Sequence, residues 1–129
     1  MEDKSEEVQD CILAEGAEDY ICFHDFLWQV HETLGIWDPA AARSQVLTLI
    51  KRYLESGHIV PGFPIDQGPE FAAWNLPVDE AMAWIEMEWD KLDREPVTGD
   101  ICWFVTTEKG KEWVRLYRER HPQLPEPEA

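Results

Sequence analysis

Basic residues are scarce in this sequence, which has 11 lysines and arginines against 27 aspartates and glutamates and a formal net charge of −16. A surface this acidic repels the phosphates of nucleic acid and the headgroups of anionic membranes at long range. The sequence also lacks any apolar run near the ~20 residues that span a bilayer. Its first residues are acidic, where a secretory signal would be basic. These absences predict a cytoplasmic protein with no membrane partner.

Cysteine is also rare, and the three cysteines (Cys11, Cys22 and Cys102) match no paired metal motif. Because each lies among apolar neighbours, we expect buried free thiols and no disulfide framework. His24 and His31, seven residues apart, share a helix face near Cys22, but a structural zinc site needs four ligands. The sequence has no glycine-rich phosphate loop, no G-x-S-x-G and no H-E-x-x-H. We therefore predict no metal, no cofactor and no enzymatic activity.

Apolar residues make up 44% of the 129 residues, and seven tryptophans supply much of that apolar surface. This is enough to bury the core of one domain. The acidic residues are concentrated in two segments. Residues 1–38 carry eleven acidic residues and one basic residue, and residues 67–108 carry ten acidic and two basic residues. The intervening segment 39–66 and the segment 109–129 are each slightly basic.

Hydrophobic spacing and turn residues predict an α-rich α+β domain over residues 18–120. We expect helices over 18–34, 39–56, 78–93 and 108–120, strands over 58–60 and 101–105, and an irregular proline-rich connection over 61–77. Residues 1–17 form either an acidic arm or a short helix, and 121–129 form a flexible tail rich in Pro and Glu. Asp38 and either Thr106 or Thr107 are expected to cap helices. The expected core contains Phe23, Leu27, Val30, Ile50, Leu54, Ile85, Trp89, Trp103, Phe104 and Trp113.

Two segments carry a family resemblance. Residues 46–59 read VLTLIKRYLESGHI, a helix that ends at Gly57 and turns into a strand, and residues 103–110 read WFVTTEKG, a strand that leads into a helix. Both segments resemble winged-helix proteins of the small bacterial regulator type. The resemblance implies a recognition helix, a first wing strand and a return strand that pairs with it antiparallel. Here about forty residues, including a helix, separate the two strands, whereas the family has a short hairpin. We therefore expect a winged-helix-like single domain with an enlarged, helix-containing insertion.

The charge distribution predicts a non-enzymatic protein-binding module that covers a basic surface on a partner protein, since complementary charge speeds encounter. An immunity or inhibitor protein is one such module. The sequence leaves open whether the module is a monomer or a homodimer. The predicted partner-binding acids are Glu18, Asp19, Glu80, Glu86, Asp90 and Asp93.

The alternative hypothesis is a winged-helix transcriptional regulator that binds DNA through the helix over 39–56. Its polar face carries Ser44, Gln45, Thr48, Lys51 and Arg52. Gln can read adenine and Arg can read guanine in the major groove. The acidic flanks disfavour nucleic acid, because contacts to phosphates supply most non-specific affinity.

Overall fold

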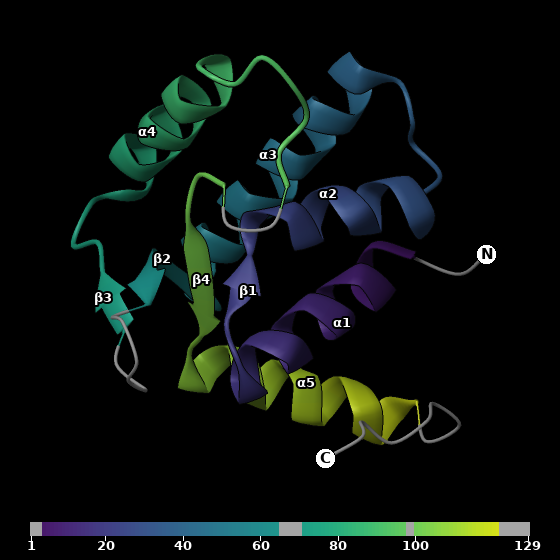
Figure 1. The fold of residues 1–129 in the computed structure, drawn as a ribbon. Helices are drawn as coiled ribbons and strands as arrows, with labels where there is room; N and C mark the ends of the chain where they lie inside the picture. The colour runs from purple at the N-terminus through teal and green to yellow at the C-terminus, as the bar shows by residue number, and fades with distance from the viewer. Residues whose placement is uncertain (1–3, 65–70, 98–99, 122–129) are drawn as a thin grey trace.

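The computed structural model describes residues 4–64, 71–97 and 100–121 (Figure 1). The tail predicted over 121–129 therefore lies outside the described residues except for His121. The elements follow one another as α1 (Lys4–Glu18), β1 (Ile21–Cys22), α2 (Phe23–Glu32), α3 (Pro39–Glu55), β2 (Ile59–Pro64), β3 (Phe71–Ala73), α4 (Val78–Asp90), β4 (Trp103–Thr106) and α5 (Glu108–Arg120). The protein is a helix-rich α+β fold with one small antiparallel sheet.

The sequence left residues 1–17 as an arm or a helix, and the structure has a helix there. Val8, Ile12 and Leu13 of α1 are buried in the main core. Gly16 lies against the sheet, where an added Cβ would come within 2.3 Å of Oγ1 of Thr106. The apolar residues of α1 thus contribute to the same core as the rest of the fold.

The single helix predicted over 18–34 is wrong. α1 ends at Glu18, and the two-residue strand β1 precedes α2. Cys22 pairs with Trp103 of β4, and the amide of Phe23 donates a hydrogen bond to the carbonyl of Cys102 (3.2 Å). A carboxylate of Asp25 accepts the Cys22 amide at 3.0 Å, which starts α2 at this point. Pairing with a distant strand therefore overrides the local helical spacing.

The sheet has the order β1-β4-β2-β3, with all neighbouring strands antiparallel. The predicted antiparallel pairing of the two main strands is confirmed, since Ile59 faces Thr106 and Val60 faces Val105. The predicted strand over 101–105 begins two residues too early, because Ile101 has a φ of 65° and leaves the extended conformation. The predicted strand over 58–60 is too short, since β2 continues to Pro64.

The connection predicted to be irregular over 61–77 contains the rest of β2 and also β3. These two strands pair with each other, and Gly62 faces Ala73. A Cβ added at Gly62 would come within 2.2 Å of the carbonyl oxygen of Ala72, so glycine permits this close approach. Among the described residues between the paired strands β2 and β4, the chain thus places β3 and α4.

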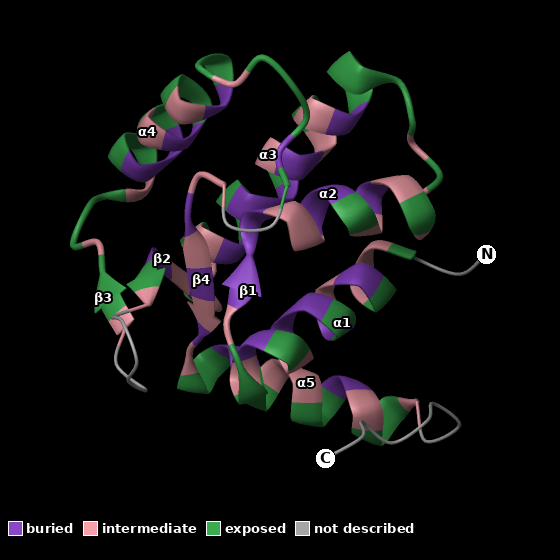
Figure 2. Ribbon diagram, viewed as in Figure 1, coloured by how far each residue is buried: buried purple, intermediate pink, exposed green. Residues whose placement is uncertain are grey.

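α1 packs on α5 and β4, whereas α2 packs on α3, and α4 lies against α3 at the far end of the molecule from α5 (Figure 1). Figure 2 shows the exposed outer side of α4 and the buried strand β1. Most of the predicted core is confirmed as buried, namely Phe23, Leu27, Val30, Ile50, Ile85, Trp89 and Phe104. Leu54, Trp103 and Trp113 are only half-buried.

Two predicted helix caps are confirmed. A carboxylate oxygen of Asp38 accepts the amide of Ala41 at 3.0 Å. The hydroxyl of Thr107 accepts the amide of Gly110 at 3.1 Å and donates to the carbonyl of Gly57 at 2.6 Å, so it joins the start of α5 to the end of α3. Both contacts satisfy groups that a helix end leaves unpaired.

The cysteines form no disulfide within the described residues. Cys22 and Cys102 are buried as predicted, and burial raises the pKa of the Cys102 thiol. The predicted burial of Cys11 is wrong, because this residue lies on the outer face of α1.

Candidate functional site

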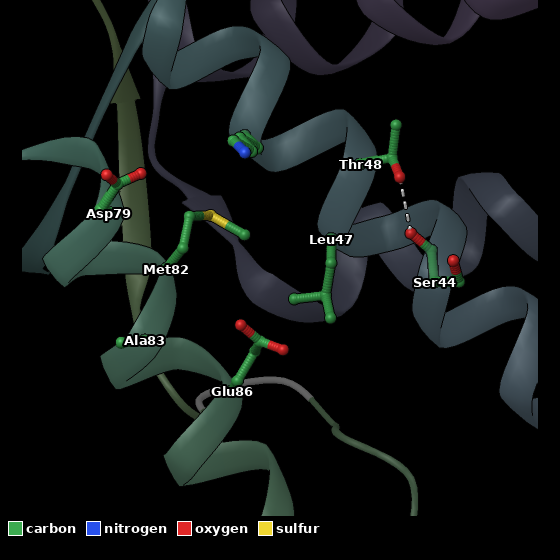
Figure 3. Close-up of a pocket in the computed structure, with 8 residues that line it drawn as sticks. Ser44, Leu47, Thr48, Asp79, Met82, Ala83 and Glu86 are labelled. Atoms are coloured by element: carbon green, nitrogen blue, oxygen red, sulfur yellow. Dashed lines mark hydrogen bonds between the residues drawn. The ribbon is translucent and has the colours of Figure 1, made fainter.

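The main candidate site is an open groove of about 380 Å³ between α3 and α4 (Figure 3). Each helix contributes one ridge of four residues spaced at i, i+3, i+4 and i+7, which is the spacing of one helix face. The α3 ridge is Ser44, Leu47, Thr48 and Lys51, and the α4 ridge is Asp79, Met82, Ala83 and Glu86. We call these eight residues the α3–α4 groove.

The groove is apolar in the middle and charged at its ends. Leu47 and Met82 point toward each other across it, and the carboxylate of Glu86 points into it (Figure 3). Lys51 brings a positive charge to the α3 ridge, and Asp79 brings a second negative charge to the α4 ridge. Among the described residues, no ion pair neutralises these three charged side chains. The groove therefore offers apolar contact together with two unpaired carboxylates.

Three of the other acidic residues of the α4 region lie outside the groove. Asp90 forms an ion pair with Arg43 at 2.8 Å, and the guanidinium of Arg43 lies 5.0 Å from the ring centre of Trp89. Asp93 lines a second hollow beside Trp89, and Glu80 is exposed on α4. Of the acids predicted to bind a partner, Glu86 is therefore the one that reaches the groove.

The predicted acids Glu18 and Asp19 lie elsewhere. They follow one another at the end of α1, which Figure 1 places away from α4. A carboxylate oxygen of Asp19 accepts the amide of Tyr20 at 2.8 Å. The structure thus divides the predicted acidic surface into two separate parts.

The residues predicted to contact DNA are divided as well. Ser44, Thr48 and Lys51 line the groove, and the Thr48 hydroxyl donates to the Ser44 carbonyl at 2.9 Å. Arg52 is exposed outside the groove, and Gln45 is half-buried. The two predicted surfaces, acidic and DNA-contacting, therefore meet in the same groove.

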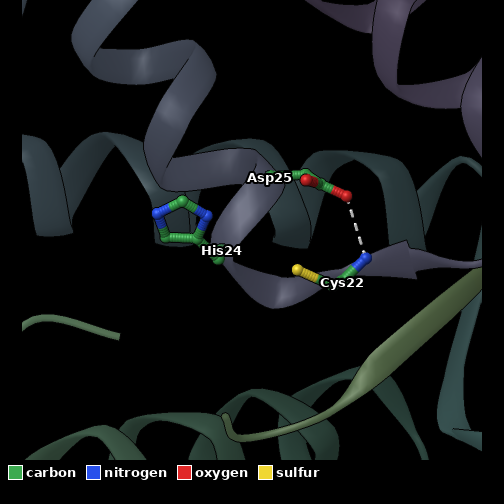
Figure 4. A group of neighbouring side chains, drawn as sticks. All are labelled: Cys22, His24 and Asp25. Atoms are coloured by element: carbon green, nitrogen blue, oxygen red, sulfur yellow. Dashed lines mark hydrogen bonds between the residues drawn. The ribbon is translucent and has the colours of Figure 1, made fainter. Parts of the chain in front are cut away.

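Cys22, His24 and Asp25 form a second cluster, in which one ligand atom of each residue lies within 4.8 Å of the others (Figure 4). They occupy the start of α2, where the helix dipole opposes a cation. The Asp25 carboxylate is directed to the Cys22 amide, as the cap of this helix. Three donors also fall short of the four ligands of a closed zinc site. Helix capping and core packing account for this cluster.

His31 does not join that cluster. Its ring stacks on the ring of Trp37, with the ring centres 4.4 Å apart and the planes at 10°. Its Nε2 lies 3.8 Å from a carboxylate oxygen of Glu95. The two histidines that share a face in the sequence pattern thus have separate surroundings.

The groove also contains four residues that were not predicted as site residues from the sequence: Leu47, Asp79, Met82 and Ala83. The spacing Asp79, Met82, Ala83, Glu86 is visible in the sequence and marks one face of a helix. The sequence does not show that this face borders α3, because no local signal fixes how two helices pack.

No helix in the described ranges has both the length and the apolar composition that crossing a bilayer requires. No protein-family model matches the chain, and comparisons with curated proteins and with solved structures gave no match.

Proposed function

We propose that this protein is a non-enzymatic, winged-helix-like module whose acidic surface binds a basic surface of another protein, as an immunity or inhibitor protein does. The arrangement of the two main strands supports the winged-helix-like part of the proposal. β2 follows α3, β4 precedes α5, and the two strands pair antiparallel. β3 and α4 occupy the place of a short wing.

One observation carries the choice of partner. The α4 ridge sets the unpaired carboxylates of Asp79 and Glu86 along the polar face of α3, on which Lys51 lies. DNA entering along this face would bring phosphates toward two carboxylates, which repel them. A basic protein surface would bring Lys or Arg there instead. The same groove thus disfavours DNA and favours a basic protein.

Affinity capture tests the proposal in extracts of the organism that encodes the chain. The bait is the wild-type protein, and the control is the variant E80Q/E86Q/D93N, whose three positions are exposed. We expect a basic protein that is retained by the wild type at low salt, is released at high salt and is retained less by the variant. Direct titration of the purified partner must reproduce this order. The proposal fails if no basic protein is retained, or if salt and the variant have no effect.

DNA binding remains the second candidate because Lys51 and Arg52 are exposed on α3. A band-shift assay with the DNA upstream of the protein's own gene tests it at low salt. A shift that disappears in the Q45A/R52A variant would place DNA binding ahead of the acidic-module proposal. The absence of a shift at micromolar protein would leave α3 as one wall of a protein-binding groove.

A further inference from the structure

On each wall of the α3–α4 groove, the lining residues follow the same spacing along the helix, namely i, i+3, i+4 and i+7. On α4, Asp79 and Glu86 enclose Met82 and Ala83, so the order along the ridge is acid, apolar, apolar, acid. Seven residues of α-helix cover about 10 Å. The two carboxylates therefore mark two points about 10 Å apart along the helix axis, with apolar surface between them.

The distance between the two carboxylates favours a helical partner segment over an extended one. Basic side chains seven residues apart on a helix lie on one face and span the same ~10 Å. On a strand, side chains that share a face recur at about 7 Å and about 14 Å, and neither value matches. The small side chain of Ala83 leaves room on the α4 ridge for the apolar side chains of such a helix.

The charged residues of the groove favour a partner segment with basic side chains. Neither Asp79 nor Glu86 has a basic partner among the described residues, whereas Glu88 is paired with Lys91 at 2.7 Å. Between the charged residues, half-buried Leu47 of the α3 ridge and buried Met82 of the α4 ridge point toward each other (Figure 3). Lys51 on the opposite wall repels a bound cation, so it lowers the affinity for a basic occupant.

We propose that the α3–α4 groove binds an amphipathic helix of the partner protein, which carries Lys or Arg at positions i and i+7 and apolar residues at i+3 and i+4. This inference rests on the proposed function, of which it specifies the site and the kind of partner. The bound helix lies along α3 and α4, with its basic residues at Asp79 and Glu86 and its apolar residues against Leu47 and Ala83, the more accessible apolar side chains of the groove. This is recognition of a helix in a groove.

The test uses a designed, fluorescently labelled peptide of about 16 residues, long enough to form a helix, with lysines seven apart and leucines between them. Fluorescence anisotropy measures its affinity for the whole protein. We expect binding that weakens with salt and falls about tenfold in the D79N/E86Q variant, since two exposed ion pairs are lost. Lys51→Glu is expected to raise the affinity.

Two controls separate the groove from general charge attraction. Glu32→Gln removes one negative charge from the exposed surface of α2, outside the groove, and is expected to change the affinity less than twofold. A peptide of the same composition with its lysines five apart places them on different faces and is expected to bind more weakly. The inference is overturned if the protein does not bind the first peptide, or if D79N/E86Q and Glu32→Gln have equal effects.

The groove and the proposed function can fail separately. If a basic partner is captured and its affinity is the same for the wild type and D79N/E86Q, the groove is not its site, although the module still binds a basic protein. If no basic partner is captured, the proposed function itself fails, whatever the designed peptide does.

Discussion

The α1–α5 side and the α3–α4 side of the molecule use their charged residues in opposite ways. Between α1 and α5, Asp10 is buried and receives two hydrogen bonds from the guanidinium of Arg118, at 2.9 and 3.0 Å. Between α3 and α4, Asp79 and Glu86 are exposed and have no basic partner among the described residues. At the α1–α5 interface a carboxylate is thus buried in an ion pair. Between α3 and α4, carboxylates line an open groove.

This difference shows which charges act in stability and which are available for binding. A buried pair that loses one partner leaves a desolvated charge, so the interface depends on both members. An exposed carboxylate keeps its hydration and adds little to folding. The acidic net charge of the chain is therefore not one property with one role. It includes a buried, paired carboxylate at α1 and exposed carboxylates without an ion-pair partner at α4.

Breaking the buried pair is expected to have the largest effect. Arg118→Ala leaves Asp10 buried without its guanidinium partner and should lower the free energy of unfolding by about 3 kcal/mol. Arg115→Ala is the matched control, because Arg115 pairs with Glu112 and Glu119 on the exposed face of the same helix. Urea unfolding of both variants checks the prediction. Equal losses in the two variants would contradict the distinction between the two sides.

Larger side chains at Gly16 of α1 and Ala83 of α4 test whether the α1–α5 side is tightly packed and the α3–α4 groove is open. A Cβ at residue 16 would meet Thr106 and Ile21 below 3 Å, so Gly16→Ala should lower the free energy of unfolding by about 1–2 kcal/mol, despite the better helix propensity of alanine. Ala83→Leu, in the open groove, should cost less than about 0.5 kcal/mol and should block the designed peptide. Thermal unfolding and anisotropy measure the two effects. A stable Gly16→Ala variant would show that α1 can move away from the sheet.

A smaller effect is expected from pH at the closed side. Burial, followed by the nearby charge of Lys109, lowers the pKa of His58 from its ordinary 6.5. Its Nδ1 lies 2.8 Å from the Ser56 hydroxyl and 3.3 Å from Nε2 of Gln9. The folded state binds the proton more weakly than the unfolded state, so His58 costs no stability above pH 6.5 and destabilises the fold as pH falls below it.

The measurement is urea unfolding at about pH 7.5 and about pH 5.5, on either side of the ordinary histidine pKa. The wild type should lose more stability over this interval than His58→Gln, which cannot be protonated. An equal loss in both proteins would place the pH dependence at other residues.

The smallest effect on folding is expected in the groove. Glu86→Gln should leave the free energy of unfolding unchanged within about 0.5 kcal/mol, because this carboxylate is exposed and unpaired. The same change should weaken the designed peptide, so folding and binding respond separately. A clear loss of stability in Glu86→Gln would mean that Glu86 belongs to the structural charges.

The parts of the fold that the sequence predicts are those with local signals. Asp38 followed by Pro39 starts α3, and Thr107 starts α5, because each cap lies within three residues of the amide that it accepts. β1 could not be predicted, since Ile21 and Cys22 lie inside a segment whose apolar spacing, from Tyr20 onward, is helical, and they are extended where β4 pairs with them. β3, with three residues in a proline-rich segment, also depends on its partner strand.

The candidate site, too, is predictable from the sequence only where the signal is local. The ridge of α3 can be read from the spacing of Ser44, Thr48 and Lys51 on one helix face. The packing of α4 beside that face depends on buried residues such as Met82 and Ile85. In the sequence, such apolar residues indicate that one face of the helix is buried, but they do not identify the helix that packs against it. For this reason the sequence yields two rival surfaces, and the structure has one groove in which their residues meet.

The pairing of Asp10 with Arg118 also fixes the order in which the chain can complete its fold. These residues are 108 positions apart. At a synthesis rate of about 5–20 residues per second, α5 is made roughly 5 to 20 seconds after α1. Val8, Ile12 and Leu13 lack their final cover during this interval. The same helix carries four acidic side chains that are not buried, and we expect their like charge to oppose association with other nascent chains: Glu6, Glu7, Glu15 and Glu18. We expect the acidity of α1 to matter most in this interval, before α5 covers the helix.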